Sequence, residues 1–213
     1  NVIELDRDVI PKLIKNCAAY GTPVVHETDV LKFDFLSFHK TLKQQKLLRI
    51  IGNLPYNIST PVIFLLLENR NVIQDMHFML QKEVVDRMAA SPGNKKYGRL
   101  TVMLGSFMEI VPLFDVPPGA FQPPPKVTSS VVRMRPKPEG DILINDPAIL
   151  STLVAQAFSQ RRKTLRNALK GTVTESDMES VGIDPGDRAE QVPVKTWARL
   201  ANNLEAANKG TAQ

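Results

Sequence analysis

Apolar residues occur along this chain in short runs, and the spacing within each run indicates the element it forms. Strand-length runs predict strands near residues 1–5, 24–29, 47–51, 76–80, 109–116 and 127–134. Helical spacing predicts helices near residues 9–19, 60–67, 82–90 and 99–107. The 47–51 run is apolar at nearly every position, which is typical of a parallel strand buried on both faces. This alternation predicts an α/β unit with a mostly parallel sheet.

Several residues are expected to begin or end these helices. Asp6 and Asp8 are expected to cap the first helix, and Gly21 to close it. Ser59 or Thr60, with proline next in the chain, predicts the N-cap and first turn of the second helix.

The pattern changes at residues 136–140, a proline- and glycine-containing stretch that is typical of a linker. Beyond it only helical spacing occurs, near residues 147–160, 161–169, 175–181 and 194–206. We therefore predict two domains, an α/β domain over residues 1–137 and a small all-α domain over residues 138–213.

Composition narrows the class of protein. Hydrophobic residues make up 43% of the 213 positions, enough for a large core, and the net charge of +5 with a pI near 9.4 favours a polyanionic partner. A single cysteine, Cys17, excludes an internal disulfide. The longest apolar runs are about six residues, short of the ~20 that span a bilayer. No histidines occur at metal-ligand spacing, so we expect a metal-free protein. The single cysteine and the short apolar runs lead us to expect a cytoplasmic protein, and we expect it to be a monomer.

The segment Asn53-Leu54-Pro55-Tyr56 follows the third predicted strand, where ligands of α/β sheets bind. The Asn53 side-chain carbonyl and the Leu54 backbone carbonyl could accept hydrogen bonds from an exocyclic adenine amine. That would free the nitrogen lone pair to attack a methyl donor. Pro55 would stiffen the turn, and Tyr56 could stack on a flipped-out base. By itself, however, this tetrapeptide also fits a simple strand-ending turn.

The segment from Gly52 to Pro61 resembles the catalytic motif of the ribosomal RNA adenine dimethyltransferases. The similarity extends over nearly the whole chain, through residues 2–8, 77–84, 97–100, 121–127 and 160–167. It is strongest to the type that dimethylates two adjacent adenosines near the 3′ end of small-subunit ribosomal RNA. Related erythromycin-resistance methylases act on large-subunit RNA, and DNA amino-methyltransferases share a related Asn/Asp-Pro-Pro-Tyr turn.

The resemblance implies a Rossmann-like class I methyltransferase fold, with S-adenosylmethionine as methyl donor and the small ribosomal subunit as partner. It implies that Glu4 accepts hydrogen bonds from the ribose of S-adenosylmethionine and that Asp29 receives its adenine amino group. Asn53 would line the donor as well. Phe121 would stack on the target base opposite Tyr56, although a ring buried against the sheet is the alternative.

The sequence departs from the family in lacking a Gly-x-Gly-x-Gly loop, which should precede Asn1 together with the first strand of the sheet. We therefore expect this chain to bind S-adenosylmethionine weakly or not at all. We also expect unpaired backbone on the neighbouring strands. A non-catalytic ribosome-assembly factor that retains a methyltransferase body stays an alternative.

The stretch from Gln160 to Lys170 contains five basic residues and no acidic one. On the predicted helix, positions 162, 166 and 170 share a face opposite Leu165 and Leu169. Such a face fits phosphate neutralisation better than pairing within the helix, although a solvated basic face is the alternative. The predicted RNA-binding residues are Arg161, Arg162, Lys163, Arg166 and Lys170.

Overall fold

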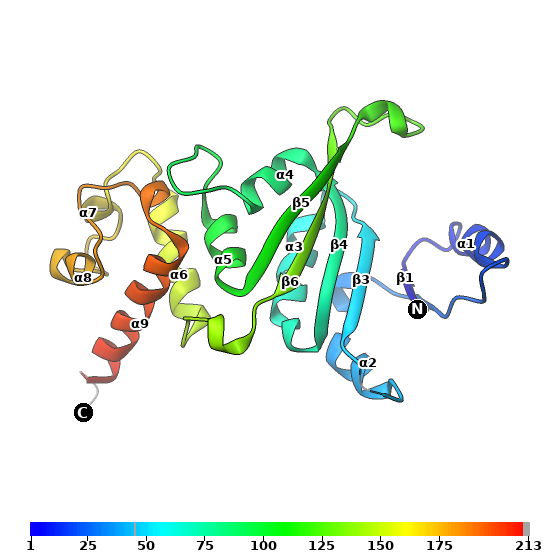
Figure 1. Ribbon diagram of the computed structural model, residues 1–213, viewed down its shortest axis with the longest axis horizontal. Helices are drawn as coiled ribbons and strands as arrows, with labels where there is room; N and C mark the ends of the chain where they lie inside the picture. Colours follow the sequence, from blue (N-terminus) through cyan, green and yellow to red (C-terminus); the bar gives the residue numbers. More distant parts are fainter. Residues whose placement is uncertain (45, 211–213) are drawn as a thin grey trace. The chain divides into compact units, whose positions relative to one another are not determined.

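The computed structural model describes residues 1–44 and 46–210, in which the chain forms two compact units. The first unit comprises Asn1–Arg49 and Pro55–Gln74, and the second comprises Ile50–Leu54 and Asp75–Gln213. Figure 1 shows the order of helices and strands along the chain.

The first unit contains two parallel strands and several helices. Strands β1 and β2 pair in parallel, with Val2 opposite Val25 and Glu4 opposite Glu27. In chain order, the elements of this unit are β1 (Val2–Glu4), α1 (Ile10–Cys17), β2 (Val25–Glu27), η1 (Val30–Lys32), α2 (Phe35–Thr41), α3 (Ser59–Glu68) and η2 (Arg70–Val72). Helix α3 packs against η1, and α2 packs against η2.

Helix α1 ends as predicted but begins differently. Gly21 has φ of 138°, a conformation that favours glycine, and its N–H donates to the Cys17 carbonyl at 3.0 Å. Val9 is the N-cap and makes no side-chain capping bond, so the prediction that Asp6 and Asp8 cap this helix is wrong. The Asp6 carboxylate instead accepts from the Asp8 N–H at 2.9 Å, which closes the turn before the helix.

Helix α2 was not predicted from the apolar pattern. Its N-cap is Asp34, whose carboxylate accepts from the Ser37 N–H at 2.9 Å. This hydrogen bond lowers the pKa of Asp34, so the charged cap persists into acidic solution. Phe33 and Phe35 lie beside the helix start with ring centroids 5.0 Å apart, and this packing stabilises a helix too short to form alone.

The second unit is built on a sheet with strand order β3-β4-β6-β5. Its strands are β3 (Leu48–Asn53), β4 (Ile73–Gln81), β5 (Met108–Val116) and β6 (Ser129–Pro136). The first residues of β3 and β4 group with the first unit. The helices of the second unit are α4 (Lys82–Met88), α5 (Arg99–Phe107), α6 (Pro147–Ser159), α7 (Leu165–Ala168), α8 (Glu175–Ser180) and α9 (Val194–Gly210).

The prediction of a mostly parallel sheet is wrong for this part of the fold, because β6 pairs antiparallel with both β4 and β5. Residues 117–128 connect β5 to β6 without a crossover helix of the kind that joins parallel strands. Between Pro112 and Phe114 the register of β5 shifts by a bulge. Proline has no N–H to donate, and it is tolerated here because β5 is an edge strand.

Strand β3 is buried on one face only, so the prediction of burial on both faces is wrong. Its residues alternate between half-buried and exposed positions, and Ile51 is 80% exposed. The strand lies at the end of the four-stranded sheet. The apolar run therefore indicated a strand correctly but not its surroundings.

Helix α5 forms the centre of the second unit. Nearly all of its residues are buried, because α4, α6 and α9 all pack against it. At Gly105 an added Cβ would lie 3.4 Å from the Val194 side chain, so α9 approaches α5 closely at this point. Figure 1 shows α6 to α9 gathered on the α5 side of the sheet. The predicted boundary near residue 138 lies inside this unit, and the division into domains there stays a prediction.

The predicted helix over residues 161–169 is wrong in its first half. Only Leu165–Ala168 is helical, although Leu165 and Leu169 are fully buried as expected. Thr164 instead forms an antiparallel bridge with Arg188, and the Leu165 N–H donates to Asp187 at 2.8 Å. Pairing with a distant segment has replaced the helical hydrogen bonds here. No helix among the described residues is long and apolar enough to cross a membrane.

Tyr97 joins the loop before α5 to the segment before α9, and its removal should weaken the second unit. Its buried hydroxyl donates to the Val192 carbonyl at 2.7 Å, and burial raises the pKa of Tyr97, so the donor stays protonated. Tyr97→Phe would leave that carbonyl unpaired. We expect a loss of about 1–3 kcal/mol in the free energy of unfolding, measured in urea by the fluorescence of Trp197.

The matched control is Tyr20→Phe, because Tyr20 is 94% exposed and should tolerate the same change. Equal unfolding midpoints for Tyr97→Phe and the parent chain would contradict this role of the hydroxyl.

Candidate active site

The turn after β3 is held by its own backbone and by a buried serine. Strand β3 ends at Asn53, and the Ile58 N–H then donates to the Pro55 carbonyl at 3.1 Å. The Ser59 hydroxyl donates to the Tyr56 carbonyl at 3.1 Å, and Ser59 is only 3% exposed. Ser59 is thus the first residue of α3 with Ile58 as N-cap, so the prediction of Ser59 or Thr60 as N-cap is wrong. These bonds fix the backbone that presents the tetrapeptide.

Gly52 lies where the backbone passes close to other side chains. A Cβ at this position would lie 3.4 Å from Leu54 and 3.6 Å from the ring of Phe78. The space beside the strand end is therefore already filled. Neither Gly52 nor Ser59 was singled out from the sequence as a functional residue, although both lie inside the motif that carries the resemblance.

Glu4 and Asp29 extend from the same edge of the β1–β2 pair, because parallel strands place their carboxyl ends together. One oxygen of Glu4 accepts from the Asp6 N–H at 2.8 Å, and one oxygen of Asp29 accepts from the Leu31 N–H at 2.9 Å. Within the described residues, the second oxygen of each carboxylate makes no hydrogen bond. Both side chains are therefore oriented and still able to accept.

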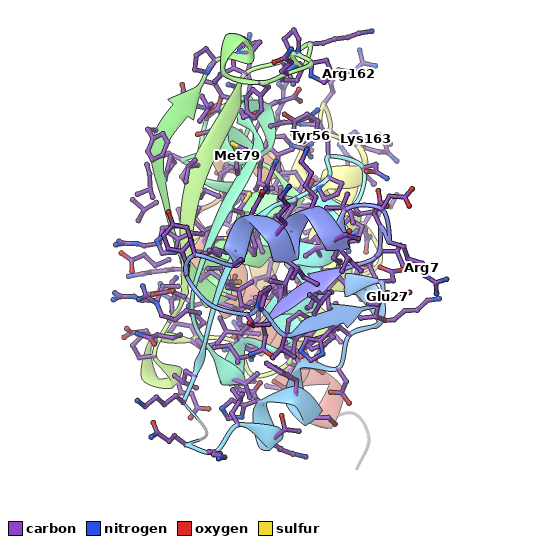
Figure 2. The ribbon with its side chains drawn as sticks, turned by 90° about the vertical axis from the view of Figure 1, so that its right-hand side faces the viewer. Arg7, Glu27, Tyr56, Met79, Arg162 and Lys163 are labelled. Carbon is purple, nitrogen blue, oxygen red and sulfur yellow. The ribbon has the colours of Figure 1, made fainter. Side chains whose placement is uncertain are left out.

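The same edge carries an ion pair between Arg7 and Glu27. Arg7 follows β1 and Glu27 ends β2, so the pair ties the loop after β1 to the neighbouring strand. Figure 2 shows the two side chains pointing toward one another. Helix α3 packs against η1, the short helix that Asp29 caps, so the segment after Tyr56 contacts the segment after Asp29.

Phe121 lies in the loop of residues 117–128 between β5 and β6. It follows the short helix η3 (Pro118–Ala120), is half-buried, and its N–H donates to the Pro118 carbonyl at 3.1 Å. It belongs to the second unit with Asn53 and Leu54, whereas Pro55 and Tyr56 belong to the first. Stacking of one base between Phe121 and Tyr56 stays a prediction.

The five predicted RNA-binding residues differ in their surroundings. One guanidinium nitrogen of Arg161 donates to the carbonyls of Lys95 and Tyr97 and to the Glu190 carboxylate, at 2.7, 3.0 and 3.0 Å. Arg166 pairs with Glu175 at 2.8 Å. Both acids lie outside the basic stretch, which is why the sequence pattern did not reveal these pairs.

The remaining basic residues of the stretch are exposed. Arg162, Lys163 and Lys170 make no ion pair or hydrogen bond through their side chains within the described part of the chain. Figure 2 shows Arg162 and Lys163 projecting from the surface. These two residues line a surface hollow together with Ser159, Gln160 and Arg161.

An Asn-Leu-Pro-Tyr segment that begins at the last residue of a strand is the turn expected of a methyltransferase that modifies amino groups of nucleic-acid bases. A family model described as ribosomal RNA adenine dimethylase matches residues 1–206. The chain belongs to this family, and the resemblance seen in the sequence is confirmed.

Two curated relatives support the assignment. Both are named ribosomal RNA small subunit methyltransferase A. The Pseudomonas aeruginosa protein is 50% identical over 204 residues, which covers 96% of this chain and 75% of the relative. The Chromobacterium violaceum protein is 51% identical and covers 96% and 76%.

Solved structures agree on the Rossmann-like methyltransferase fold. A dimethyladenosine transferase from Plasmodium falciparum superposes with a TM-score of 0.80 at 27% identity, over 98% of this chain and 82% of that one. The 23S rRNA methyltransferase ErmE gives 0.71 at 21% identity, over 95% and 80%, and supports the fold alone.

Arg161 and Arg162 are adjacent, yet their replacement should have different effects on stability. Arg161→Ala removes three hydrogen bonds that hold residues 95–97 to the helices, and the half-exposed side chain limits the loss to about 1 kcal/mol. Arg162→Ala should change the free energy of unfolding by less than about 0.5 kcal/mol. Urea unfolding measures both, and equal losses would show that Arg161 is not a structural residue.

Proposed function

We propose that this protein, with S-adenosylmethionine as donor, dimethylates N6 of two adjacent adenosines near the 3′ end of small-subunit ribosomal RNA, within ribosome biogenesis. The observation that carries the proposal is the fixed turn from Asn53 to Tyr56 at the end of β3. About 50% identity to relatives named small subunit methyltransferase A supports the RNA over the large-subunit alternative. The oriented acids Glu4 and Asp29 disfavour a non-catalytic assembly factor.

The proposed chemistry rests on orientation. The Asn53 side-chain carbonyl and the Leu54 backbone carbonyl accept hydrogen bonds from the adenine amine and so direct its lone pair away from the ring. Pro55 and the Ser59 hydroxyl bond keep the turn rigid before the substrate arrives. Tyr56 and Phe121 stack on the base and fix its plane. No general base with a shifted pKa is required, because the proton of the methylated amine leaves to water.

The acceptor groups on the β1–β2 edge suit S-adenosylmethionine. Glu4 and Asp29 each keep one acceptor oxygen, which suits ribose hydroxyls and an adenine amino group respectively, and Asn53 would line the methyl end. When bound, this cofactor supplies an electrophilic methyl group. No group of three His, Cys, Asp or Glu residues arranged to hold a metal occurs among the described residues.

The RNA is proposed to lie along the exposed cations Arg162, Lys163 and Lys170, with Arg161 and Arg166 at the same surface. Lysine and arginine side chains of this kind neutralise phosphates and position the RNA without reading its sequence. We place the protein in the cytoplasm as a monomer that acts on the small ribosomal subunit.

Asn53→Ala should abolish methylation, because it removes one of the two acceptors for the amine. We expect transfer of labelled methyl groups to undermethylated small subunits to fall at least roughly a hundredfold. The assay uses a form extended at its amino terminus by a Gly-x-Gly-x-Gly segment, because this chain is expected to bind S-adenosylmethionine weakly or not at all. Asn145→Ala, which truncates an exposed asparagine of the second unit, is the matched control. Full activity of Asn53→Ala would refute the proposed role of the turn.

Reversing the charge of Arg162 and Lys163 should weaken binding to the small subunit. For each phosphate that is no longer neutralised, the negative slope of log K against log salt becomes shallower by roughly 0.7–0.9. Lys12→Glu with Lys15→Glu is the matched control, since it changes the net charge equally on helix α1. Filter binding across a salt series separates the two pairs, and identical slopes for both would contradict a specific role for the 162–163 segment.

A further inference from the structure

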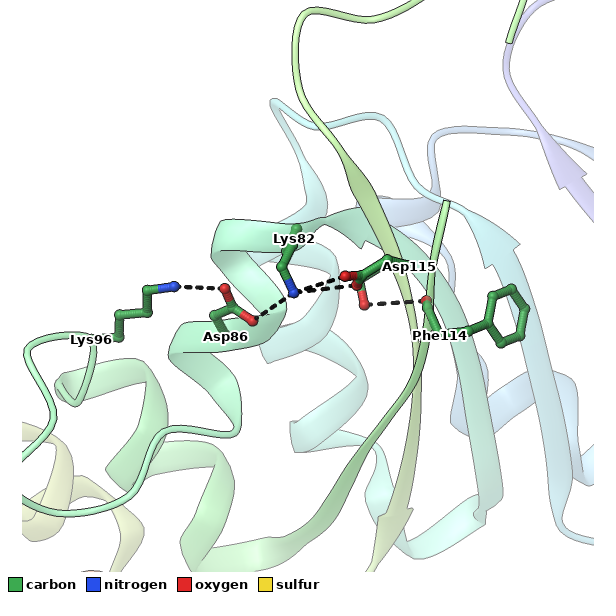
Figure 3. A network of polar contacts seen from close by, with 6 residues as sticks. Lys82, Asp86, Lys96, Phe114 and Asp115 are labelled. Carbon is green, nitrogen blue, oxygen red and sulfur yellow. Dashed lines mark hydrogen bonds and ion pairs between the residues drawn. The ribbon is translucent and has the colours of Figure 1, made fainter. Parts of the chain in front are cut away.

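The loop that carries Phe121 is held at both ends by one residue, Lys82. This lysine is the first residue of α4 and directly follows β4. Its backbone N–H donates to the carbonyl of Thr128, where the loop ends, at 2.9 Å. Its Nζ lies 3.0 Å from the carboxylate of Asp115, just before the loop begins. Figure 3 shows the side-chain contact.

The acceptor at the start of the loop is itself fixed by the sheet. Asp115 in β5 lies opposite Ser130 in β6, and the buried Ser130 hydroxyl donates to the Phe114 carbonyl at 3.3 Å. The side chain of Lys82 therefore contacts a rigid position on β5, and its backbone N–H contacts a second position next to β6.

Lys82 is also held from the opposite side. Asp86, one turn further along α4, lies 3.5 Å from its Nζ, and the second oxygen of Asp86 pairs with Lys96 at 2.6 Å. The charges alternate in sign along this line. The hydrogen bond between Lys82 and Asp115 raises the pKa of the amine and lowers that of the carboxyl, while the bond from Lys96 lowers the pKa of Asp86. Lys82, Asp86 and Asp115 are thus charged near neutral pH.

We infer that Lys82 is a positioning residue for methyl transfer, which sets the place of Phe121 by fixing both ends of its loop. The inference rests on the proposed function, in which Phe121 stacks on the target adenine. Lys82 and Asp115 have side chains 44% and 49% exposed, and ion pairs of this kind add little to global stability. Removing the amine should therefore increase the mobility of the loop without changing the stability of the unit.

The first test measures the loop directly and needs no methyl transfer. Lys82→Met removes the amine and keeps the backbone bond and the aliphatic stem. Hydrogen exchange of the amides at residues 119–122, 126 and 127 should become roughly fivefold faster, with α5 unchanged. Lys82→Arg should restore slow exchange, and Lys195→Met, at an exposed lysine of α9, is the control. Unchanged exchange in the loop, or equal acceleration in α5, would overturn the inference.

The second test connects the loop to the reaction. In the form extended at its amino terminus, Lys82→Met should lower kcat for undermethylated small subunits about fivefold at unchanged KM, with rescue by Lys82→Arg. Combined with Phe121→Ala, Lys82→Met should cause no further loss, because it acts through that ring. Additive losses would overturn the inference. If Phe121→Ala alone keeps full activity, the proposed role of Phe121 fails, whereas the exchange result still decides whether Lys82 holds the loop.

Discussion

The antiparallel pairing of β6 with β4 and β5 is the constraint on which the second unit depends. It places Ser129 beside Gln81 and Ser130 beside Asp115, and thereby brings the two ends of the 117–128 loop together at the start of α4. Without this pairing neither the loop nor Lys82 would have a defined partner. The same sheet has β3 at its other end, where Asn53 completes the strand. The strand order thus gives Asn53 and the Phe121 loop a common support.

The basic stretch from Gln160 to Lys170 contains both cations that pair within the protein and cations that face solvent. Arg161 and Arg166 direct their charge to acids and carbonyls within the protein, whereas Arg162 and Lys163 face solvent. Partly paired arginines keep the exposed cations at a fixed place on the surface. A preformed array binds phosphates at a lower entropic cost than a flexible one.

Much of the fold could be predicted from the sequence, because most strands and helices have strong local patterns. The 99–107 helix and the 47–51 strand are examples. The role predicted for the tetrapeptide that begins at Asn53 depended on the resemblance, because its residues alone also fit a strand-ending turn. Long-range partners could not be predicted. Thr164 bridges Arg188 in place of helical pairing. The hydroxyl that donates to Val192 and the contacts of Lys82 likewise join residues far apart in the sequence. Helix α2 was missed for a local reason, because it depends on a cap at Asp34 and on the packing of Phe33 and Phe35, which the apolar spacing does not reveal.

The central position of β6 also determines the order in which the chain can fold during its synthesis. Strand β4 is complete at Gln81, but its neighbour begins only at Ser129. Until the ribosome has released residues 129–136, the edge of β4 that pairs with β6 in the finished protein has no partner, on a strand that carries the apolar residues Met76, Phe78 and Leu80. The nascent chain therefore passes through a stage with an open apolar strand edge. Binding of that edge by a chaperone is most valuable in this interval.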